Sequence, residues 1–321
     1  MKFATSYFGN RILRHVSADM QQLAQQRFDL VVHTFSENDQ RYFAGTMKEI
    51  VGASRANGLE VWLDPWGVGG VFGGEAFSRV ALEESSWAQT ARDGSRLPAC
   101  CPNNPNFRQF LASWIDAACE MKPDAIFWDE PHFYTDRIGR VPGCHCRHCE
   151  ILARDRGIRD DDLLRGTSTL LLLEWAFRRV RSRGGRNVVC LLPPELSEGG
   201  RVDWESIARI DGLDNLGTDP YWAILNTEPE PFIKRYAQKL NNVAAPATVP
   251  IHLWIQGFSI AAGHEEEITR AVIQAAEAKP EVIAIWGFEG CAAMSSLACE
   301  NPHLAWEAFL KGAETVRARQ D

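Results

Sequence analysis

The sequence predicts an α/β protein built as a (β/α)8 TIM barrel, and three observations lead to this fold class. Short apolar runs alternate with segments of helical period through all 321 residues. The runs are continuously apolar, which is typical of strands buried on both faces of a parallel sheet. The eight strand and helix pairs expected here fit a closed barrel with long loops after the third and fourth strands.

The expected elements alternate strictly along the chain. The strands are Phe3–Phe8, Phe28–Phe35, Leu59–Pro65, Ala125–Trp128, Asn187–Leu192, Leu213–Gly217, Ile251–Ile255 and Val282–Trp286. The helices are Gln21–Gln26, Arg41–Ala56, Asn106–Met121, Leu163–Arg183, Trp204–Ile210, Pro231–Leu240, Glu265–Ala278 and His303–Val316. Asn57-Gly58 ends the second helix and Pro105 opens the third, because glycine favours helix ends and proline the first helical turn.

A doubly wound open sheet is the alternative architecture. Such sheets usually carry a glycine-rich phosphate turn after the first strand, and Phe8-Gly9-Asn10-Arg11 does not supply one. No linker rich in proline, glycine or serine interrupts the chain. We therefore expect one barrel domain spanning residues 1–321.

Composition and charge narrow the classes of partner. The formal net charge is −8, whereas phosphate binding needs a basic face, so nucleic acid is not expected as the main partner. No apolar run approaches the roughly 20 residues that cross a bilayer, and the first residues lack the apolar core of a signal peptide. We expect a cytoplasmic protein without a membrane partner, and a homo-oligomer is compatible with the sequence.

The loop after the third strand is rich in glycine. The segment DPWGVGGVFGGE carries five glycines from Gly67 to Gly74, and the next helix is expected only at about Pro105. No Lys-Ser or Lys-Thr follows the glycines, as it would in a phosphate-binding P-loop. A flexible lid or a close backbone turn is therefore the favoured interpretation.

Polar and aromatic residues gather at the expected C-terminal strand ends, which form the active face of such barrels. They are His33, Glu37, Asp64, Trp66, Trp128, Asp129, Glu130, His132, Glu195, Asp219, Tyr221, Trp222, Trp254, Gln256, Trp286 and Glu289. Indole faces stack on the C–H faces of sugars, while Asp, Gln and His bind hydroxyl groups. The pattern predicts a carbohydrate pocket, with Asp64, Trp66, His132, Tyr221, Trp254, Gln256 and Trp286 as the binding residues.

Paired carboxylates are the usual machinery for cleaving glycosides, because one donates a proton while the other attacks or activates water. Asp129 and Glu130 are adjacent, so in an extended segment their side chains point to opposite sides. One is expected to point into the pocket, and the other to bind a neighbouring loop or orient its partner. A structural role for Asp129, capping the following turn, is the alternative.

A second segment predicts a metal site. Cys144, Cys146 and Cys149 form a C-x-C-x-x-C pattern, and structural zinc takes four ligands of this type in a tetrahedron. The fourth ligand is expected from Cys100 or Cys101, with His145 or His148 as substitutes. Such a zinc ion would be structural and would take no part in the chemistry.

These segments resemble family 42 of the glycoside hydrolases, the β-galactosidases. The similar residues are CPNNPNFR (Cys101–Arg108), a strand ending at Glu130, and the thiols of Cys144–Cys149. The resemblance implies zinc on Cys101, Cys144, Cys146 and Cys149, and Glu130 as the catalytic acid and base. Two positions depart from that family's pattern, since Asp129 stands in place of Asn and Gln256 lies where the nucleophilic Glu is expected.

The sequence therefore predicts a glycoside hydrolase acting on a small glycoside or oligosaccharide. Its second carboxylate is expected from Glu289 or, next, from Asp219, with Asp129 a further catalytic candidate. One alternative is a barrel that binds a saccharide without cleaving it, because Gln256 cannot act as a nucleophile. Another is a sugar-acid lyase or isomerase that uses His33, His132 or His252 with a catalytic metal, although His252 lies within an apolar strand.

Overall fold

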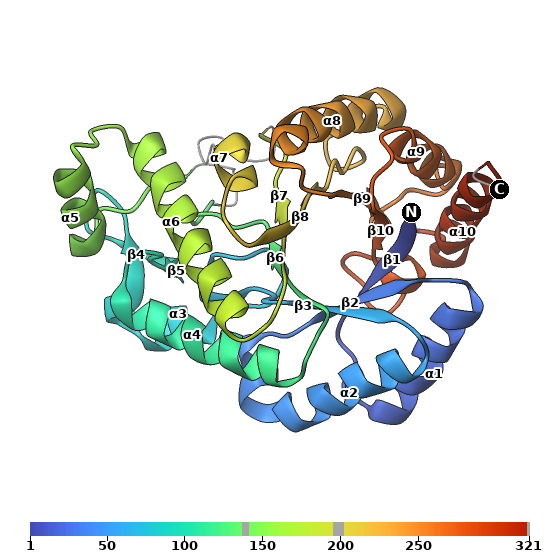
Figure 1. Cartoon of the computed structure of the whole chain (residues 1–321), viewed down its shortest axis with the longest axis horizontal. Coiled ribbons are helices and arrows are strands. Elements are labelled where there is room, and N and C mark those ends of the chain that lie inside the picture. The colour runs from blue at the N-terminus through green and yellow to red at the C-terminus, as the bar shows by residue number, and fades with distance from the viewer. Residues whose placement is uncertain (137–140, 195–201, 320–321) are drawn as a thin grey trace. The chain divides into compact units, whose positions relative to one another are not determined.

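The computed structural model describes residues 1–136, 141–194 and 202–319. In this part of the chain, eight parallel strands form a closed barrel in the order β1-β10-β9-β8-β7-β6-β3-β2. Helices lie between the strands in the chain, as Figure 1 shows. The predicted (β/α)8 fold class is confirmed.

Each barrel strand coincides with a predicted one. The strands are β1 (Lys2–Tyr7), β2 (Leu30–Thr34), β3 (Glu60–Asp64), β6 (Ala125–Asp129), β7 (Asn187–Leu191), β8 (Leu213–Thr218), β9 (Ile251–Gln256) and β10 (Val282–Trp286). Every residue of β2, β6, β7, β9 and β10 is buried. Burial on both faces explains why these strands appear as uninterrupted apolar runs.

The predicted helices are also present, several with extended bounds. They are α1 (Leu13–Gln25), α2 (Ala44–Ala56), α4 (Pro105–Glu120), α6 (Asp161–Ser182), α7 (Trp204–Ala208), α8 (Pro229–Ala244), α9 (Glu266–Ala276) and α10 (Pro302–Ala318). Four further elements were not expected: α3 (Arg79–Glu83), β4 (Ala88–Thr90), β5 (Arg96–Cys100) and α5 (Arg147–Arg156). The prediction that no helix precedes Pro105 after the third strand is therefore wrong, because α3 and an antiparallel β4–β5 pair occupy that segment.

The chain gathers into two compact units. The first unit comprises Met1–His33, Glu49–Trp62 and Asn215–Asp321, and the second comprises Thr34–Lys48 and Leu63–Asp214. None of the helices in the described ranges combines the length and apolar composition that crossing a bilayer requires.

In the first unit, an aromatic cluster joins the first strand to the last helix. Phe28 stacks on Trp306 and on Phe309, with ring centroids 5.1 and 5.8 Å apart, and Phe3 meets Phe309 edge to face. Helix α10 packs closely on α9 beside Gly312, where a Cβ atom would lie only 2.8 Å from the side chain of Val272. These contacts hold the two ends of the described chain together.

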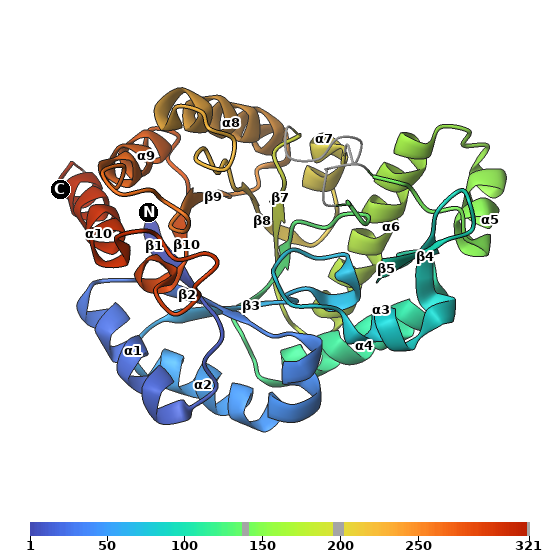
Figure 2. The same cartoon turned by 180° about the vertical axis from the view of Figure 1, so that it is seen from behind.

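In the second unit, the core is built around two buried tryptophans. Trp114 donates its indole N–H to the carbonyl of Phe35 at 2.9 Å, and Trp128 donates to Asn187 Oδ1 at 3.0 Å. Trp128 is fully buried and packs against aromatic neighbours on three other elements. It belongs to this core and not to a sugar-stacking surface. Figure 2 shows the neighbouring β4–β5 pair with α5 and α6.

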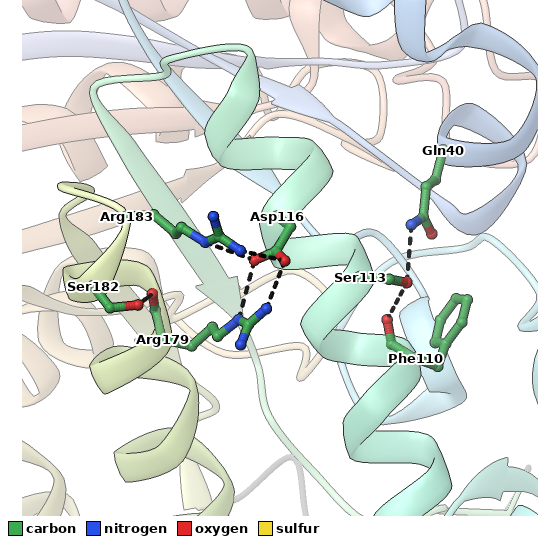
Figure 3. A network of polar contacts seen from close by, with 7 residues as sticks. All are labelled: Gln40, Phe110, Ser113, Asp116, Arg179, Ser182 and Arg183. Carbon is green, nitrogen blue, oxygen red and sulfur yellow. Dashed lines mark hydrogen bonds and ion pairs between the residues drawn. The ribbon is translucent and has the colours of Figure 1, made fainter.

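Helices α4 and α6 of the second unit are joined by a three-residue ion network (Figure 3). Asp116 accepts paired hydrogen bonds from Arg179, at 3.1 and 2.5 Å, and from Arg183, at 3.0 and 2.6 Å. Partial burial raises the pKa of Asp116, but the hydrogen bonds from the two guanidinium groups outweigh it, and the net pKa lies below the ordinary value. Bidentate pairs of this kind restrict both partners geometrically.

We expect Asp116→Asn to lower the free energy of unfolding by about 1 kcal/mol at pH 7, since the network is partly exposed. A depressed pKa stabilises the folded state above the unfolded pKa of about 4, and this contribution is lost as the pH falls through the folded value. Denaturant unfolding at pH 7 and pH 3 measures the difference, which should shrink at the lower pH. The control is Asp155→Asn, which alters an exposed pair with Arg154; an equal effect in both variants would contradict the prediction.

Candidate active site and metal site

Four carboxylates of the second unit interact electrostatically near the ends of two barrel strands. Asp64 ends β3, Asp129 ends β6, Glu130 follows directly, and Glu75 lies in the loop after β3. The charges of Glu75 and Glu130 raise the pKa of Asp64, in addition to the larger effect of burial. We call Asp64, Glu75, Asp129 and Glu130 the carboxylate cluster.

The side chains of Asp129 and Glu130 approach the same point. A Cβ atom added to Gly73 would lie 2.6 Å from Asp129 Oδ2 and 2.8 Å from Glu130 Oε2. The prediction that the two side chains diverge is therefore wrong. The cause is the backbone of Glu130, which has a φ of +38°, so the alternation of side chains in an extended strand does not apply there. Such a conformation is uncommon for a residue other than glycine.

Backbone hydrogen bonds fasten the loop after β3 to the end of β6. The amide of Gly73 donates to the carbonyl of Asp129 at 2.9 Å, and the amide of His132 donates to the carbonyl of Val71 at 3.0 Å. Within the loop, Gly67 donates to the carbonyl of Gly73 at 2.8 Å. The glycine-rich segment is therefore a closely fitted turn, the second of the two interpretations offered by its sequence.

Glu37 holds the same loop from a third strand end. Its carboxylate accepts hydrogen bonds from the amide of Gly69 at 2.9 Å, the hydroxyl of Ser78 at 2.7 Å and the amide of Val80 at 2.9 Å. The side chain is buried and its oxygens are occupied by these donors. Glu37 is thus a structural residue that orders the loop and the start of α3.

Two members of the carboxylate cluster, Asp64 and Asp129, are buried, and no ion pair to either is found among the described residues. Asp64 is 0% exposed, and neither of its carboxylate oxygens has a hydrogen-bond partner within the described residues. Burial raises the pKa of Asp129, and the charges of Glu130, Asp64 and Glu75 raise it further. Burial likewise raises the pKa of Glu75 above its ordinary value. The carboxyl groups of Asp64, Asp129 and Glu75 therefore retain their protons at a higher pH than exposed carboxylates do.

Trp66 lies beside the cluster and is the one predicted stacking residue with a partly exposed side chain. Its indole N–H donates to Glu75 Oε2 at 3.1 Å. Gly74 packs directly on the indole, because a Cβ atom there would overlap the ring. By contrast, Trp254 and Trp286 are buried and meet edge to face at 5.4 Å in the first unit.

The predicted residues at the ends of β8, β9 and β10 belong to the first unit. Gln256 is fully buried, accepts a hydrogen bond from the amide of Ala223 at 3.0 Å and donates to the carbonyl of Phe258 at 3.0 Å. Tyr221 is buried and meets Phe258 edge to face at 5.1 Å. These side chains support the loops after β8 and β9.

The two expected partner carboxylates differ in their surroundings. Asp219 follows β8 and is buried, at 2% exposure. Glu289 lies in a turn after β10 and accepts a hydrogen bond from Gln22 of α1 at 2.8 Å. The carboxylate of Glu289 is therefore already held by a surrounding helix.

The three histidines considered as catalytic candidates each have a different hydrogen-bond partner. Burial lowers the pKa of His33 to about 3, and its Nε2 lies 2.8 Å from the hydroxyl of Ser54. Burial also lowers the pKa of His252 to about 3, and its Nδ1 lies 2.6 Å from Asn215 Oδ1. His132 Nδ1 lies 2.5 Å from the carbonyl of Glu130, at the edge of the carboxylate cluster. His252 is thus a core residue hydrogen-bonded within the strands.

Four thiols of the second unit form the candidate metal site. The Sγ atoms of Cys101, Cys144, Cys146 and Cys149 all lie within 4.8 Å of one another, and within the described ranges this is the one such group of potential ligands. Cys101 Sγ lies 3.5 Å from Cys149 Sγ and 3.4 Å from Cys146 Sγ. Cys100 points elsewhere, and burial raises the pKa of its thiol.

The donor set fits a structural zinc ion. Tetrahedral coordination with Zn–S bonds of about 2.3 Å separates neighbouring sulfurs by about 3.8 Å, close to the spacing observed. Asn103 donates a hydrogen bond to Cys149 Sγ at 3.3 Å, an outer contact of the kind that orients metal ligands. Zinc there would join the segment after β5 to the start of α5, where Phe133 and Leu164 pack against the thiols.

Comparisons with known proteins identify the fold. No family model matches the chain, and a search of curated proteins gives no match. Among solved structures, the catalytic domain of β-amylase from Paenibacillus polymyxa is 10% identical, covers 98% of both chains and has a TM-score of 0.66. An endo-1,4-β-mannanase from Rhizomucor miehei is 11% identical, covers 99% of this chain and 95% of that chain, and has a TM-score of 0.68.

Other barrels of similar structure carry a different activity. D-psicose 3-epimerase from Clostridium cellulolyticum H10 is 11% identical, covers 99% of each chain and has a TM-score of 0.56. At these identities the likeness establishes the barrel fold alone. The resemblance to the family 42 enzymes therefore remains one of short motifs.

We expect metal analysis to find one zinc ion per chain, and a strong chelator to lower Tm by about 5 °C or more, because metal binding free energy contributes to folding. Cys101→Ser should reproduce both effects. The matched control is Cys119→Ser, whose thiol lies outside the four-sulfur group. A chain that contains no zinc and has the same Tm with and without chelator would contradict this prediction.

We expect Asp64→Asn to stabilise the folded chain at neutral pH. A raised carboxyl pKa means that folding becomes less favourable as the pH rises from about 4 through the folded value, because the unfolded chain loses its proton first. Removing roughly 1 kcal/mol of charge burial should raise Tm by about 2 °C at pH 8 and have little effect at pH 4. The exposed Asp211 provides the control Asp211→Asn; a lower Tm for Asp64→Asn at pH 8 would contradict the argument.

Proposed function

We propose that this barrel is an enzyme that cleaves a glycoside by carboxylate acid and base catalysis. The observation that carries the proposal is the carboxylate cluster, which lies at two strand ends beside the partly exposed indole of Trp66. Cleavage needs one protonated and one ionised carboxyl group, and the indole offers an apolar face to a sugar ring. The folds of β-amylase and mannanase are compatible with this activity.

Glu130 is the proposed acid and base. It is more exposed than Asp129 or Asp64 and follows β6 directly, so a substrate can reach its carboxylate at the strand end. Burial and the neighbouring negative charges raise the pKa of Asp64 and of Asp129 beside it. The backbone conformation at Glu130 directs its side chain toward Gly73.

Asp219 and Glu289 stay the candidates outside the cluster for the second carboxylate. Asp219 is buried directly after a barrel strand, and one oxygen of Glu289 is hydrogen-bonded to Gln22. Asp129 is the candidate within the cluster itself. Trp66 would stack on the sugar, and Asp64 and His132 would support the pocket around it. The four thiols would hold zinc in a structural role.

Saccharide binding without cleavage is the second candidate function. Gln256 stands where the family 42 resemblance expects the nucleophile, and its amide is hydrogen-bonded to the backbone of Ala223 and of Phe258. A side chain that anchors two loops is not available for chemistry. Under this reading the cluster would bind sugar hydroxyl groups, and no glycosidic bond would break.

We expect Glu130→Gln to reduce kcat on aryl glycosides at least 100-fold while leaving Tm near that of the wild type, because general acid catalysis contributes at least this much. Asp219→Asn and Glu289→Gln, measured in parallel, identify the second carboxylate by a comparable loss. The anomer released first, followed by NMR, gives the stereochemistry: retention indicates carboxyl groups about 5–5.5 Å apart and inversion about 6.5–9.5 Å. Full turnover by Glu130→Gln would overturn the assignment, and sugar binding without turnover by the wild type would favour the second candidate.

A further inference from the structure

A cavity of about 520 Å³ lies in the first unit, among the loops that follow β8 and β9. Its lining includes Trp222, Asn226 and Glu228 after β8, and Ser259, His264 and Glu267 between β9 and the first turn of α9. Loops at the C-terminal ends of barrel strands are where such folds bind their ligands. The volume is within the range of about 300–1,000 Å³ that is usual for small-molecule sites.

The carboxylate of Glu267 holds two other side chains of the cavity wall in place through hydrogen bonds. Glu267 accepts a hydrogen bond from the indole N–H of Trp222 at 2.8 Å, and its second oxygen lies 2.8 Å from His264 Nδ1. The first bond ties the loop after β8 to α9. The second orients the exposed imidazole of His264, whose pKa is raised above its ordinary value by the hydrogen bond to Glu267. The cavity is therefore largely preformed.

The backbone of the lining is also constrained. Asn226 and Ser259 have φ values of +49° and +51°, in the left-handed region that costs energy for residues other than glycine. The amide of Thr227 donates to the carbonyl of Trp222 at 3.1 Å, and that of Ser259 donates to Leu297 at 2.8 Å. Strained backbone conformations cluster at functional sites, and here two of them occur on one cavity.

The chemistry of the lining indicates which ligands it accepts. Glu228 and Glu267 are acidic, and among the described residues no lysine or arginine lines this cavity, so phosphates and other anions are disfavoured. Amide, hydroxyl and imidazole groups of Asn226, Thr227 and His264 offer both donors and acceptors. This composition matches an uncharged ligand with many hydroxyl groups. Trp222 is fully buried, so binding depends on hydrogen bonds and not on stacking.

We propose that this cavity is a saccharide-binding site that shares no residue with the carboxylate cluster. The inference rests on the proposed function for its class of ligand, but it holds equally if the barrel binds sugars without cleaving them. Affinity would then depend on the loops after β8 and β9.

The test uses the full chain carrying Glu130→Gln, titrated calorimetrically with maltotriose, mannotriose and N,N′-diacetylchitobiose. Thr227→Val removes a hydroxyl group of the lining at nearly constant volume, and Asn226→Gly removes the amide while glycine tolerates the positive φ. Each should weaken binding of the preferred sugar by about three- to tenfold. The matched control Thr315→Val removes a hydroxyl group from α10, outside the lining, and should leave affinity unchanged.

Each outcome separates this proposal from the proposed function. Variant-sensitive binding supports the site, whether or not the wild type cleaves aryl glycosides. An affinity for the sugar that is the same in both lining variants as in the parent chain would overturn the proposed site. The absence of any sugar binding would overturn it as well. In either case, turnover of aryl glycosides by the wild type would still support the glycosidase proposal. Inorganic phosphate should not displace the bound sugar, and displacement would overturn the charge argument. Unchanged Tm for both lining variants verifies that the fold is retained.

Discussion

The carboxylates of Asp64 and Asp129 are buried at the ends of two barrel strands, and keeping them there requires support from the surrounding chain. A buried carboxylate without a cation is unfavourable when it is charged. Burial therefore raises the pKa of such a carboxyl group, which then keeps its proton to a higher pH. The amide of Gly73 fixes the backbone of Asp129, and Glu37 orders the loop that carries Glu75. The segment after β3 therefore helps to hold these carboxyl groups at the ends of β3 and β6.

The four cysteine thiols of the candidate metal site lie in the second unit as well. Cys101 follows β5, while Cys144, Cys146 and Cys149 lie around the start of α5. Apolar side chains, including Phe133 and Leu164, pack against the four thiols, so a metal would add to the packing that already joins these segments. A metal at this point would fasten the chain after β6, which begins with Glu130, without entering the chemistry.

Local sequence predicted the barrel well, because strands buried on both faces leave an uninterrupted apolar signal. It missed most of α1, although Val16, Met20 and Leu23 are buried at helical spacing. It also mistook the direction of Glu130, because alternation assumes an extended backbone and the φ of +38° is set by tertiary contacts. Glu75 was not predicted as part of the site, since its position depends on a loop folded against β6. The hydrogen bond between Gln22 and Glu289 joins residues 267 positions apart, beyond the reach of any local pattern.

Gln256 links the end of β9 to the cavity of the first unit. Its side-chain oxygen accepts a hydrogen bond from the backbone amide of Ala223, and Ala223 lines the cavity together with Trp222. A glutamate there would lose the N–H group that donates to Phe258 and would bring a buried charge to the loop. Gln256 thus stabilises the loops that form the proposed saccharide site. The same side chain supplies no carboxylate at the end of β9, so the proposed catalysis depends on carboxylates from other strands.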